Sequence, residues 1–226
     1  LARGKLPIVA GGTGLYLDSL LSGRTFAPFS PDGGLRARLE ARFDALGGEA
    51  MLGELAAADP EAAARLHPND RKRIVRALEV FQQTGKTISQ HNRETRALPL
   101  RYDALTLSLA FQRREDMWAR IDRRVDEMMA AGLAEEVRAL LDSGVPAWCT
   151  AMQAIGYKEM AAAQRGGGDV CAAADEIKLR SRQYAKRQLT WFRRTEGAKW
   201  LFWGPEPDFE AACRTSTKYL EEFGLV

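Results

Sequence analysis

The fold of this chain is decided by residues 6–21, which read LPIVAGGTGLYLDSLL. The apolar run Leu6–Ala10 predicts a buried inner strand of a parallel sheet, and the apolar positions after Gly14 recur at helical spacing. A strand, a glycine loop and a helix in this order make half of a βαβ unit. Because a buried strand cannot stand alone, we expect a further segment before Leu1 in the complete protein.

Residues 35–84 are expected to be helical almost throughout, because alanine-rich amphipathic stretches follow one another there. Pro60 stands at a first-turn position, where its missing N–H costs nothing. In the turn that comes next, Asn69 or Asp70 can cap the following helix, and Gly85 is the expected terminator of that helix.

The part of the chain after this helical stretch is predicted to contain both strands and helices. Residues 104–110 alternate at period two and predict a strand, and 199–203 predict a short final one. Helices are expected over 114–141 with a break at Gly132, over 175–194 and over 209–223. Few strands separated by helices indicate an α/β fold, with helices on the faces of a sheet. We therefore expect a core of 1–29 and 102–226 that carries an all-helical inserted subdomain at 30–101.

The composition argues against several classes of protein. No apolar run approaches the roughly 18 residues of a membrane span and no leader is apparent, so we expect a cytoplasmic protein without a membrane anchor. Cys149, Cys171 and Cys213 are odd in number and far apart, which favours reduced thiols over a disulfide framework. His67 and His91 are too few for a zinc site or a Ser-His-Asp triad, and we expect them to be capping or surface residues.

The glycine loop Gly11–Gly14 is the first segment that could carry chemistry. Glycines between a strand and a helix let the backbone approach a ligand, and a helix N-terminus favours anions. Thr13 adds a hydroxyl at the carboxyl edge of the sheet, where ligands of α/β proteins bind. A tight turn that binds nothing explains the same spacing equally well, and the loop is not a Walker A sequence, which needs Gly-Lys-Ser/Thr.

Basic residues gather in two places, although the formal net charge is only +3. Residues 177–195 contain seven basic side chains and no acid: Lys178, Arg180, Arg182, Lys186, Arg187, Arg193 and Arg194. Like charges at this density repel one another along a helix, so we favour a polyanionic ligand there, either pyrophosphate or RNA. The second group is Arg71, Lys72, Arg73 and Arg76, for which a solvated face is the better interpretation if the helix is taken alone.

Five segments of the chain, taken in order, resemble the tRNA dimethylallyltransferase family, also called the tRNA isopentenyl-pyrophosphate transferases. They are GGTGLY at 11–16, HPNDRKRIVRALEV at 67–80, RIDRRVDEM at 120–128, AIGYKE at 154–159 and RQYAKRQLTWFR at 182–193. Each segment alone has modest specificity. Five of them in the family's order, over nearly the whole chain, are highly specific.

The resemblance implies a P-loop-NTPase-like α/β core, in which helices flank a parallel sheet, and a helical insertion. It implies transfer of a dimethylallyl group from dimethylallyl diphosphate to N6 of the adenosine 3′-adjacent to the anticodon in tRNA. That adenosine must leave the anticodon stack before its amine attacks the allylic carbon. Pyrophosphate then leaves, its charge held by Mg²⁺ and basic donors. The implied partners are the tRNA anticodon stem-loop and dimethylallyl diphosphate, and nothing demands more than a monomer.

The resemblance also assigns roles to residues of this sequence. Thr13 is expected near the reacting centre, as a catalytic residue and a tRNA contact, and Arg36 is expected to contact tRNA at the start of the insertion. Three stretches are expected to bind tRNA: Lys72, Arg73, Ile74, Val75 and Arg76; Gln153, Ala154, Ile155, Gly156, Tyr157 and Lys158; and Lys186, Arg187, Gln188, Leu189, Thr190, Trp191, Phe192 and Arg193. Arg182 and Arg187 could instead face the diphosphate. This interpretation requires three features to converge on one crevice: the cationic helices predicted at 71–83 and 175–194, and the bend at 11–14 that carries Thr13.

One departure from the family's pattern concerns its N-terminal P-loop, Gly-x-Thr-x-x-Gly-Lys-Thr or similar, and its Asp-Ser-x-Gln segment, whose aspartate is the implied general base. Neither occurs in these 226 residues. We therefore expect the complete gene product to be an enzyme and the 226-residue chain alone to be inactive. Two alternatives stay open: a P-loop kinase-like enzyme that turns over nucleoside triphosphates without RNA, and a non-catalytic RNA-binding module.

Overall fold

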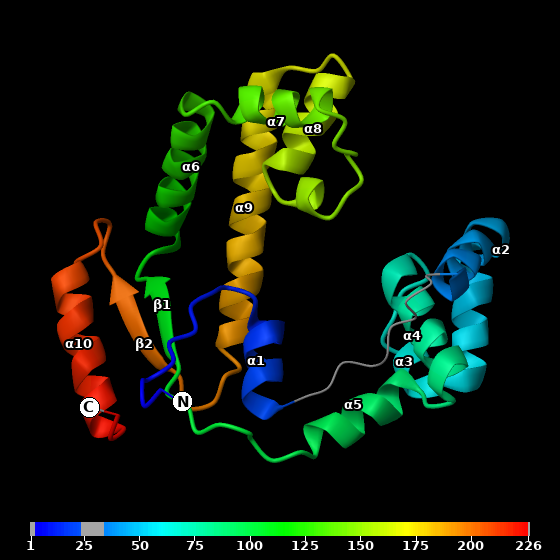
Figure 1. The fold of residues 1–226 in the computed structure, drawn as a ribbon, viewed down its shortest axis with the longest axis horizontal. Coiled ribbons are helices and arrows are strands. Elements are labelled where there is room, and N and C mark those ends of the chain that lie inside the picture. The colour runs from blue at the N-terminus through cyan, green and yellow to red at the C-terminus, as the bar shows by residue number, and fades with distance from the viewer. Residues whose placement is uncertain (1–2, 24–33, 226) are drawn as a thin grey trace. The chain divides into compact units, whose positions relative to one another are not determined.

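The computed structural model describes residues 3–23 and 34–225 and divides the chain into two compact units (Figure 1). One unit joins Leu1–Gly14 to Leu105–Val226, and the other is Leu15–Ala104. The predicted boundary between residues 29 and 30 lies outside the described residues. The bounds 30–101 for an inserted subdomain therefore stay a prediction.

The described residues of the unit Leu15–Ala104 form helices and the turns between them. α1 (Gly14–Ser22) is followed by α2 (Gly34–Ala58), α3 (Pro60–Ala63), α4 (Arg71–Thr84) and α5 (Ile88–Arg96). α2 bends at Gly47, whose φ of 81° and ψ of 166° lie outside the helical region and suit only glycine. The helical character predicted for residues 35–84 is confirmed.

α2 and α4 enclose the core of this helical unit. Leu39, Met51, Leu55, Ile74 and Leu78 are buried there together. Each fully buried side chain of this kind contributes roughly 1.5–3 kcal/mol relative to an exposed one. The core therefore lies along the contact between the two longest helices of the unit.

Asp59 is a buried carboxylate that joins α3 to α5. Its Oδ1 accepts a hydrogen bond from Ala62 N at 3.0 Å, and its Oδ2 accepts one from Ser89 N at 2.9 Å. Pro60 occupies the first turn of α3, as predicted. Burial raises the pKa of Asp59, but the hydrogen bonds from Ser89 and Ala62, together with the nearby Arg65, outweigh burial and hold it below its usual value.

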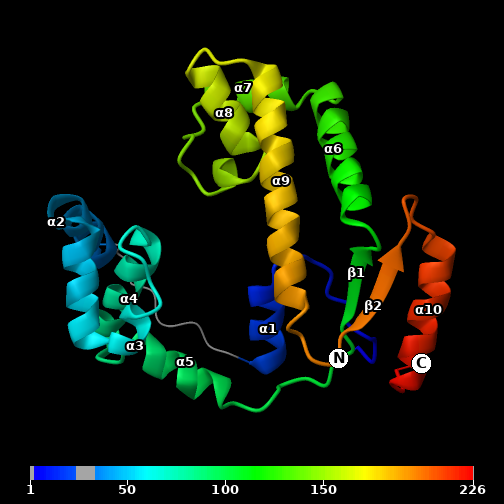
Figure 2. The ribbon, with the colours of Figure 1, turned by 180° about the vertical axis from the view of Figure 1, so that it is seen from behind.

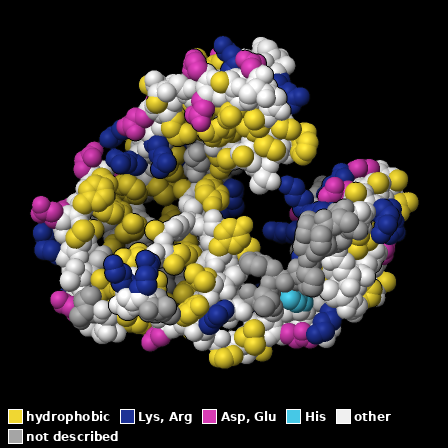
Figure 3. Space-filling model, in the orientation of Figure 1, with side chains coloured by type: hydrophobic (Ala, Val, Ile, Leu, Met, Phe, Trp, Pro, Cys, Tyr) yellow, Lys and Arg dark blue, Asp and Glu magenta, His cyan; other side chains and the backbone are white. Residues whose placement is uncertain are grey.

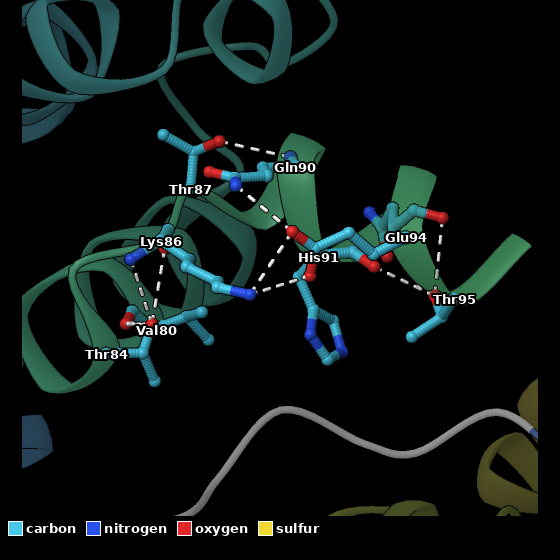
Figure 4. Close-up of polar contacts among 9 residues, drawn as sticks. Val80, Thr84, Lys86, Thr87, Gln90, His91, Glu94 and Thr95 are labelled. Atoms are coloured by element: carbon cyan, nitrogen blue, oxygen red, sulfur yellow. Dashed lines mark hydrogen bonds and ion pairs between the residues drawn. The ribbon is translucent and has the colours of Figure 1, made fainter. Parts of the chain in front are cut away.

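The turn between α4 and α5 is held by polar contacts (Figure 4). Gly85 ends α4 with a left-handed φ of 70°, which confirms it as the terminator. Lys86 Nζ lies 2.9 Å from Oε2 of Glu94, and this hydrogen bond is the main reason why the pKa of Glu94 is lowered. Thr87 caps α5 through its hydroxyl oxygen, and the backbone N of His91 donates to the Thr87 carbonyl at 3.0 Å. His91 is thus half-buried within a short helix.

The other unit holds a two-stranded parallel sheet. β1 (Leu107–Phe111) pairs with β2 (Lys199–Trp203), and Leu109 lies opposite Leu201. Both predicted strands are confirmed, although β1 begins later than residue 104. Parallel strands need a long crossover, which here is built from helices. The α/β fold class predicted from the sequence is confirmed.

The crossover and the C-terminal segment supply the helices of this unit. They are α6 (Arg114–Ala130), α7 (Leu133–Asp142), the short 3₁₀ helix η1 (Ala151–Gln153), α8 (Tyr157–Arg165), α9 (Val170–Phe192) and α10 (Phe209–Glu222). Figure 2 shows α6 alongside α9 and α10 beside β2. Gly132, with φ of 98°, separates α6 from α7 as predicted. The core of this helical part includes Val125, Val137, Met152 and Ile177.

The strand predicted at Leu6–Ala10 is wrong. No segment among the described residues pairs with it, and a strand is stable only where a neighbour satisfies its N–H and C=O groups. Its side chains are exposed instead, Ile8 to 86%. Figure 3 shows further hydrophobic side chains at the surface of this unit, in keeping with the exposed Leu109, Phe202 and Phe209.

Candidate functional site

The glycine loop Gly11–Gly14 packs against the C-terminal half of α9. Gln188 Nε2 donates a hydrogen bond to the carbonyl oxygen of Gly12 at 3.1 Å. A Cβ added at Gly12 would lie 1.8 Å from Gln188 Nε2, and one at Gly14 would lie 2.1 Å from Cδ1 of Trp191. Glycine is needed at both positions because side-chain atoms of α9 fill the space that a Cβ would take.

Thr13 lies between these two contacts and immediately precedes α1. Its side chain is exposed. A tight turn that binds nothing would account for the glycines, but it gives no reason to hold an exposed hydroxyl beside a cationic helix. The structure therefore brings together two of the predicted features, the Thr13 bend and the basic helix. The third feature, α4, belongs to the other unit, so its convergence with them stays a prediction.

The first half of α9 carries cations that are already neutralised. Lys178 Nζ lies 2.5 Å from Oδ1 of Asp126, and Arg182 Nη1 lies 3.3 Å from Oδ2 of Asp122, both on α6. Arg180 pairs with an acid one turn earlier on α9 itself, at 2.6 Å. The hydrogen bond to Asp126 raises the pKa of Lys178. The expectation that all seven cations need an external polyanion is thus wrong for these three.

The end of α9 and the two residues after it differ in charge. Among the described residues, no acid forms an ion pair with Lys186, Arg187, Arg193 or Arg194, and all four side chains are exposed. They belong to the same stretch of the chain as Gln188 and Trp191, which contact the glycine loop. The uncompensated positive charge is therefore concentrated at the end of α9 that the Thr13 loop contacts.

The structure distinguishes the two arginines predicted to face a diphosphate. The Arg182 guanidinium is paired with Asp122 and lies 5.9 Å from the ring centroid of Trp118. Arg187 contacts the ring of Tyr184 at 5.5 Å and has no acidic partner among the described residues. Arg187 is thus the better placed of the two to bind an anion, and the diphosphate role of both stays a prediction.

A groove of about 700 Å³ runs between α8 and α9 in the same unit, and four residues predicted to bind tRNA line it. These are Gln153, Ile155, Lys158 and Arg187. Its wall also holds three acids: Glu159 accepts from Gly156 N at 2.9 Å, Asp169 accepts from Cys171 N at 2.8 Å, and Glu176 pairs with Arg180. The groove is therefore mixed in charge, with Lys158, Arg180 and Arg187 as its cations.

The segment before α8 is held by a glycine and a tyrosine. Gly156 has a φ of 105°, which favours glycine at this position. The hydroxyl of the half-buried Tyr157 donates to Glu136 on α7, and this hydrogen bond is the main reason why the pKa of Tyr157 is raised. Gln153 donates to Ala147 O at 2.9 Å. The side chain of Tyr157 thus fixes the segment, while Lys158 is exposed.

In the helical unit, the predicted tRNA-binding stretch on α4 divides into two faces. Lys72 and Arg73 are exposed, and Arg76 is half-buried. Ile74 and Val75 are 0% and 1% exposed and belong to the core of α2 and α4. The helical period that exposes the cations turns these two side chains inward. The tRNA-binding role of the stretch stays a prediction.

The turn that precedes α4 is anchored by its own polar groups. His67 Nδ1 accepts from Asn69 N at 3.2 Å, which agrees with the expected capping role. Asp70 does not cap α4 through its side chain; it accepts from His67 N at 3.1 Å instead. Gly48 on α2 lies so close that a Cβ there would be 2.1 Å from the carbonyl oxygen of Pro68. These contacts position the start of α4 on α2.

The described residues lack two further features. No group of three or more His, Cys, Asp or Glu side chains could hold a metal ion. No helix among these residues is both long and apolar enough to cross a membrane.

Comparison with known proteins identifies the family. The model of the IPP transferase family matches residues 1–195. The chain belongs to this family. Among curated relatives, tRNA dimethylallyltransferase 1 of Trichlorobacter lovleyi is 51% identical over 199 residues, covering 88% of this chain and 65% of the relative. The tRNA dimethylallyltransferase of Bacillus subtilis is 43% identical over 208 residues, covering 92% and 65%.

Solved structures agree with the IPP transferase assignment. The full-length tRNA isopentenylpyrophosphate transferase of Bacillus halodurans has a TM-score of 0.63 at 34% identity, covering 98% of this chain and 68% of that one. A eukaryotic dimethylallyltransferase acting on tRNA has a TM-score of 0.70 at 25% identity, covering 98% and 58%. The chain spans about 65% of the length of the first curated relatives it matches.

Proposed function

We propose that the protein transfers a dimethylallyl group from dimethylallyl diphosphate to N6 of the adenosine 3′-adjacent to the anticodon in tRNA. Membership of the IPP transferase family supports this proposal, and so do relatives named tRNA dimethylallyltransferase. The observation that carries it in this chain is the contact between the Thr13 loop and the uncompensated end of α9. An exposed hydroxyl on a loop that contacts this end of α9, where no described acid pairs with the cations, suits a reaction between an RNA base and a diphosphate ester.

In the proposed reaction, the N6 amine attacks the allylic carbon of the donor. A C–N bond forms, the C–O bond to the diphosphate breaks, the bonding electrons leave with pyrophosphate, and one N6 proton passes to a base. We assign Thr13 to the reacting centre, where its hydroxyl can form a hydrogen bond to a reacting group. Arg187 is our candidate for the leaving diphosphate, because its guanidinium can donate two hydrogen bonds to phosphate oxygens.

The remaining cations and the groove are assigned to tRNA. The exposed cations that would contact backbone phosphates are Lys186 on α9, Arg193 at its C-cap, Lys158 on α8, and Lys72 and Arg73 on α4. Mg²⁺ is the proposed cofactor. The described residues contain no cluster of three or more His, Cys, Asp or Glu side chains that could hold it, so they offer no protein cage of that kind.

We further propose that residues 1–226 alone transfer no prenyl group. They contain neither the Gly-x-Thr-x-x-Gly-Lys-Thr pattern nor an Asp-Ser-x-Gln segment, and the tripeptide Gly85-Lys86-Thr87 forms the turn between α4 and α5. We therefore expect them to lack the diphosphate cradle and the implied base. Monomeric action in the cytoplasm completes the proposal.

The decisive test is mass spectrometry of anticodon stem-loop RNA after incubation with dimethylallyl diphosphate and Mg²⁺. The enzyme would be a fusion that places the P-loop-bearing N-terminal segment of a full-length relative before residue 1, compared with residues 1–226 alone. We expect the adenosine to gain one C5H8 unit with the fusion only. RNA binding without transfer by the fusion would favour a non-catalytic RNA-binding module, and RNA-independent nucleoside triphosphate turnover would favour a kinase-like enzyme.

A further inference from the structure

Glu79 is a buried carboxylate placed between two arginines of the helical unit. It lies on α4 and is 0% exposed. Its Oε2 accepts a hydrogen bond from Arg76 Nη1 at 2.7 Å and lies 3.9 Å from Nη1 of Arg36. Arg76 comes from α4 and Arg36 from the first turn of α2. One carboxylate therefore joins guanidinium groups that two different helices supply.

Stability alone does not account for this arrangement. Glu79 is surrounded in sequence by the buried side chains Val75, Leu78 and Val80, so an apolar residue would fit the same core. Its Oε1 has no hydrogen-bond partner among the described residues, although it is buried. A buried ion pair is often no more stabilising than a well-packed apolar group of similar volume, and an unsatisfied carboxylate oxygen adds a cost.

The two arginines can reach solvent although the carboxylate cannot. Their side chains are 34% exposed for Arg36 and 29% exposed for Arg76. Arg36 uses Nε to bind Glu40 at 3.3 Å and turns Nη1 toward Glu79, which leaves Nη2 without a partner among the described residues. Two guanidinium groups this close repel each other unless an anion lies between them. Glu79 supplies that anion from the buried side.

We infer that Glu79 is a positioning residue that holds Arg36 and Arg76 together as a pair for one RNA phosphate. The inference rests on the proposed function, because it presumes that tRNA is the ligand of this surface. Lys72 and Arg73, exposed on the same helix, add phosphate contacts that need no such support. The carboxylate touches no RNA itself and acts through the two guanidinium groups.

The direction in which one substitution changes RNA affinity distinguishes a positioning role of Glu79 from an effect of net charge alone. Glu79→Gln removes a negative charge next to two cations. If only net charge mattered, RNA would bind more tightly and with a steeper salt dependence. If Glu79 positions the pair, RNA binds more weakly although the surface has become more positive.

Glu61 offers a matched control in the same unit. It also pairs with two arginines, Arg65 at 2.7 Å and Arg93, but these contacts are exposed and lie outside the stretches predicted to bind tRNA. Glu61→Gln makes the same change in net charge. We expect this variant to bind RNA as the unaltered chain does, or slightly more tightly.

The experiment measures binding of an anticodon stem-loop RNA to the 226-residue chain over a series of salt concentrations. We expect Glu79→Gln to weaken binding about tenfold and to lower the salt slope by about one, as loss of one phosphate contact would. Binding by Glu79→Gln that equals or exceeds that of the unaltered chain overturns the inference alone. Failure of the unaltered chain to bind RNA also overturns the inference, whereas the proposed function fails only if the fusion transfers no prenyl group.

A second measurement keeps the test decisive if Glu79→Gln does not fold. Butanedione modification of the unaltered chain, mapped by mass spectrometry, reports the reactivity of each arginine with and without RNA. We expect RNA to protect Arg36 and Arg76 together. Protection of only one of the two, or of neither, contradicts a shared phosphate site.

Discussion

Gln188 Nε2 donates a hydrogen bond to the carbonyl oxygen of Gly12 at 3.1 Å and thereby joins α9 to a loop 176 residues away in the sequence. Trp191, one turn further along α9, packs against Gly14 of the same loop. These contacts place the exposed Thr13 next to the cations of α9 that no described acid neutralises. The proposed active site depends on this arrangement.

The packing of Trp191 on the loop predicts a stability difference between two similar glycines. Gly14→Ala places a Cβ inside the indole ring of Trp191 and should lower the free energy of unfolding by about 1–3 kcal/mol, since overpacking forces neighbouring groups apart. A Cβ at Gly11 would have no atom within 4 Å, so Gly11→Ala should change the free energy of unfolding by less than about 0.5 kcal/mol. Urea unfolding followed by circular dichroism measures both. Equal effects of the two substitutions would mean that the loop does not pack on α9.

The hydroxyl of Thr13 predicts a loss of rate without a loss of binding. In the fusion that carries the P-loop segment, Thr13→Ala should slow prenyl transfer by roughly 10²–10³-fold, because a group aimed at the reacting centre is removed. RNA affinity should change less than about threefold, since one neutral side chain contributes little beside the phosphate contacts. Thr13→Ser, which keeps the hydroxyl, should restore most of the rate. A rate unchanged in Thr13→Ala would remove Thr13 from the reaction.

The uneven charge of α9 predicts that its two halves respond differently to alanine. Lys186→Ala should weaken RNA binding and reduce the salt slope by about one, because one phosphate contact is lost. Lys178→Ala should leave affinity and slope almost unchanged, since Asp126 already neutralises that cation at 2.5 Å. Salt-dependent fluorescence anisotropy distinguishes the two variants. Similar losses in both would show that α9 binds RNA along its whole length.

Asp59 predicts a pH-dependent stability of the helical unit. The pKa of Asp59 in the folded protein lies below its usual value, so the ionised carboxylate stabilises the fold. This stabilisation is fully present at a pH above the pKa of Asp59 in the unfolded chain. It is lost as the pH falls through the pKa of Asp59 in the folded protein. Asp59→Asn keeps a helix cap but cannot accept hydrogen bonds at both atoms. The variant should be less stable at pH 7 by about 1–3 kcal/mol, with Ser89 or Ala62 losing its acceptor.

The sign of the pH effect provides the check on Asp59. The difference in the free energy of unfolding between the unaltered chain and Asp59→Asn should become smaller as pH falls below about 4, because both chains then carry a neutral group at this position. Asp44→Asn, which removes an exposed pairing with Arg71, serves as control and should cost less than about 1 kcal/mol at any pH. A difference that stays constant from pH 7 to pH 3 would contradict the assignment to Asp59.

Local patterns in the sequence predict much of the fold. Gly85 and Gly132 adopt the left-handed conformations expected where one helix ends and the next begins. The run at 199–203 forms β2 over those same residues. Leu6–Ala10 fails because its apolar pattern describes only its own side chains, whereas a strand also needs a partner. No described segment provides one.

The candidate site was harder to predict, because charge and burial depend on residues far away in the sequence. Asp122 and Asp126 neutralise cations of α9 across roughly 50 to 60 residues, and no window of α9 alone contains them. Glu79 carries a weak local signal, since it stands three residues after Arg76 on a helix, but its burial and its proximity to Arg36 emerge only from the packing of α4 on α2.

The proposed site is tested most directly by photo-crosslinking an anticodon stem-loop RNA, with thiouridine placed next to the target adenosine, to the 226-residue chain and mapping the linked peptides. We predict crosslinks to residues 11–16 and 186–193, the two segments that meet at Gly12 and Gln188. Crosslinks confined to the neutralised first half of α9, or to surfaces remote from Thr13, would contradict it.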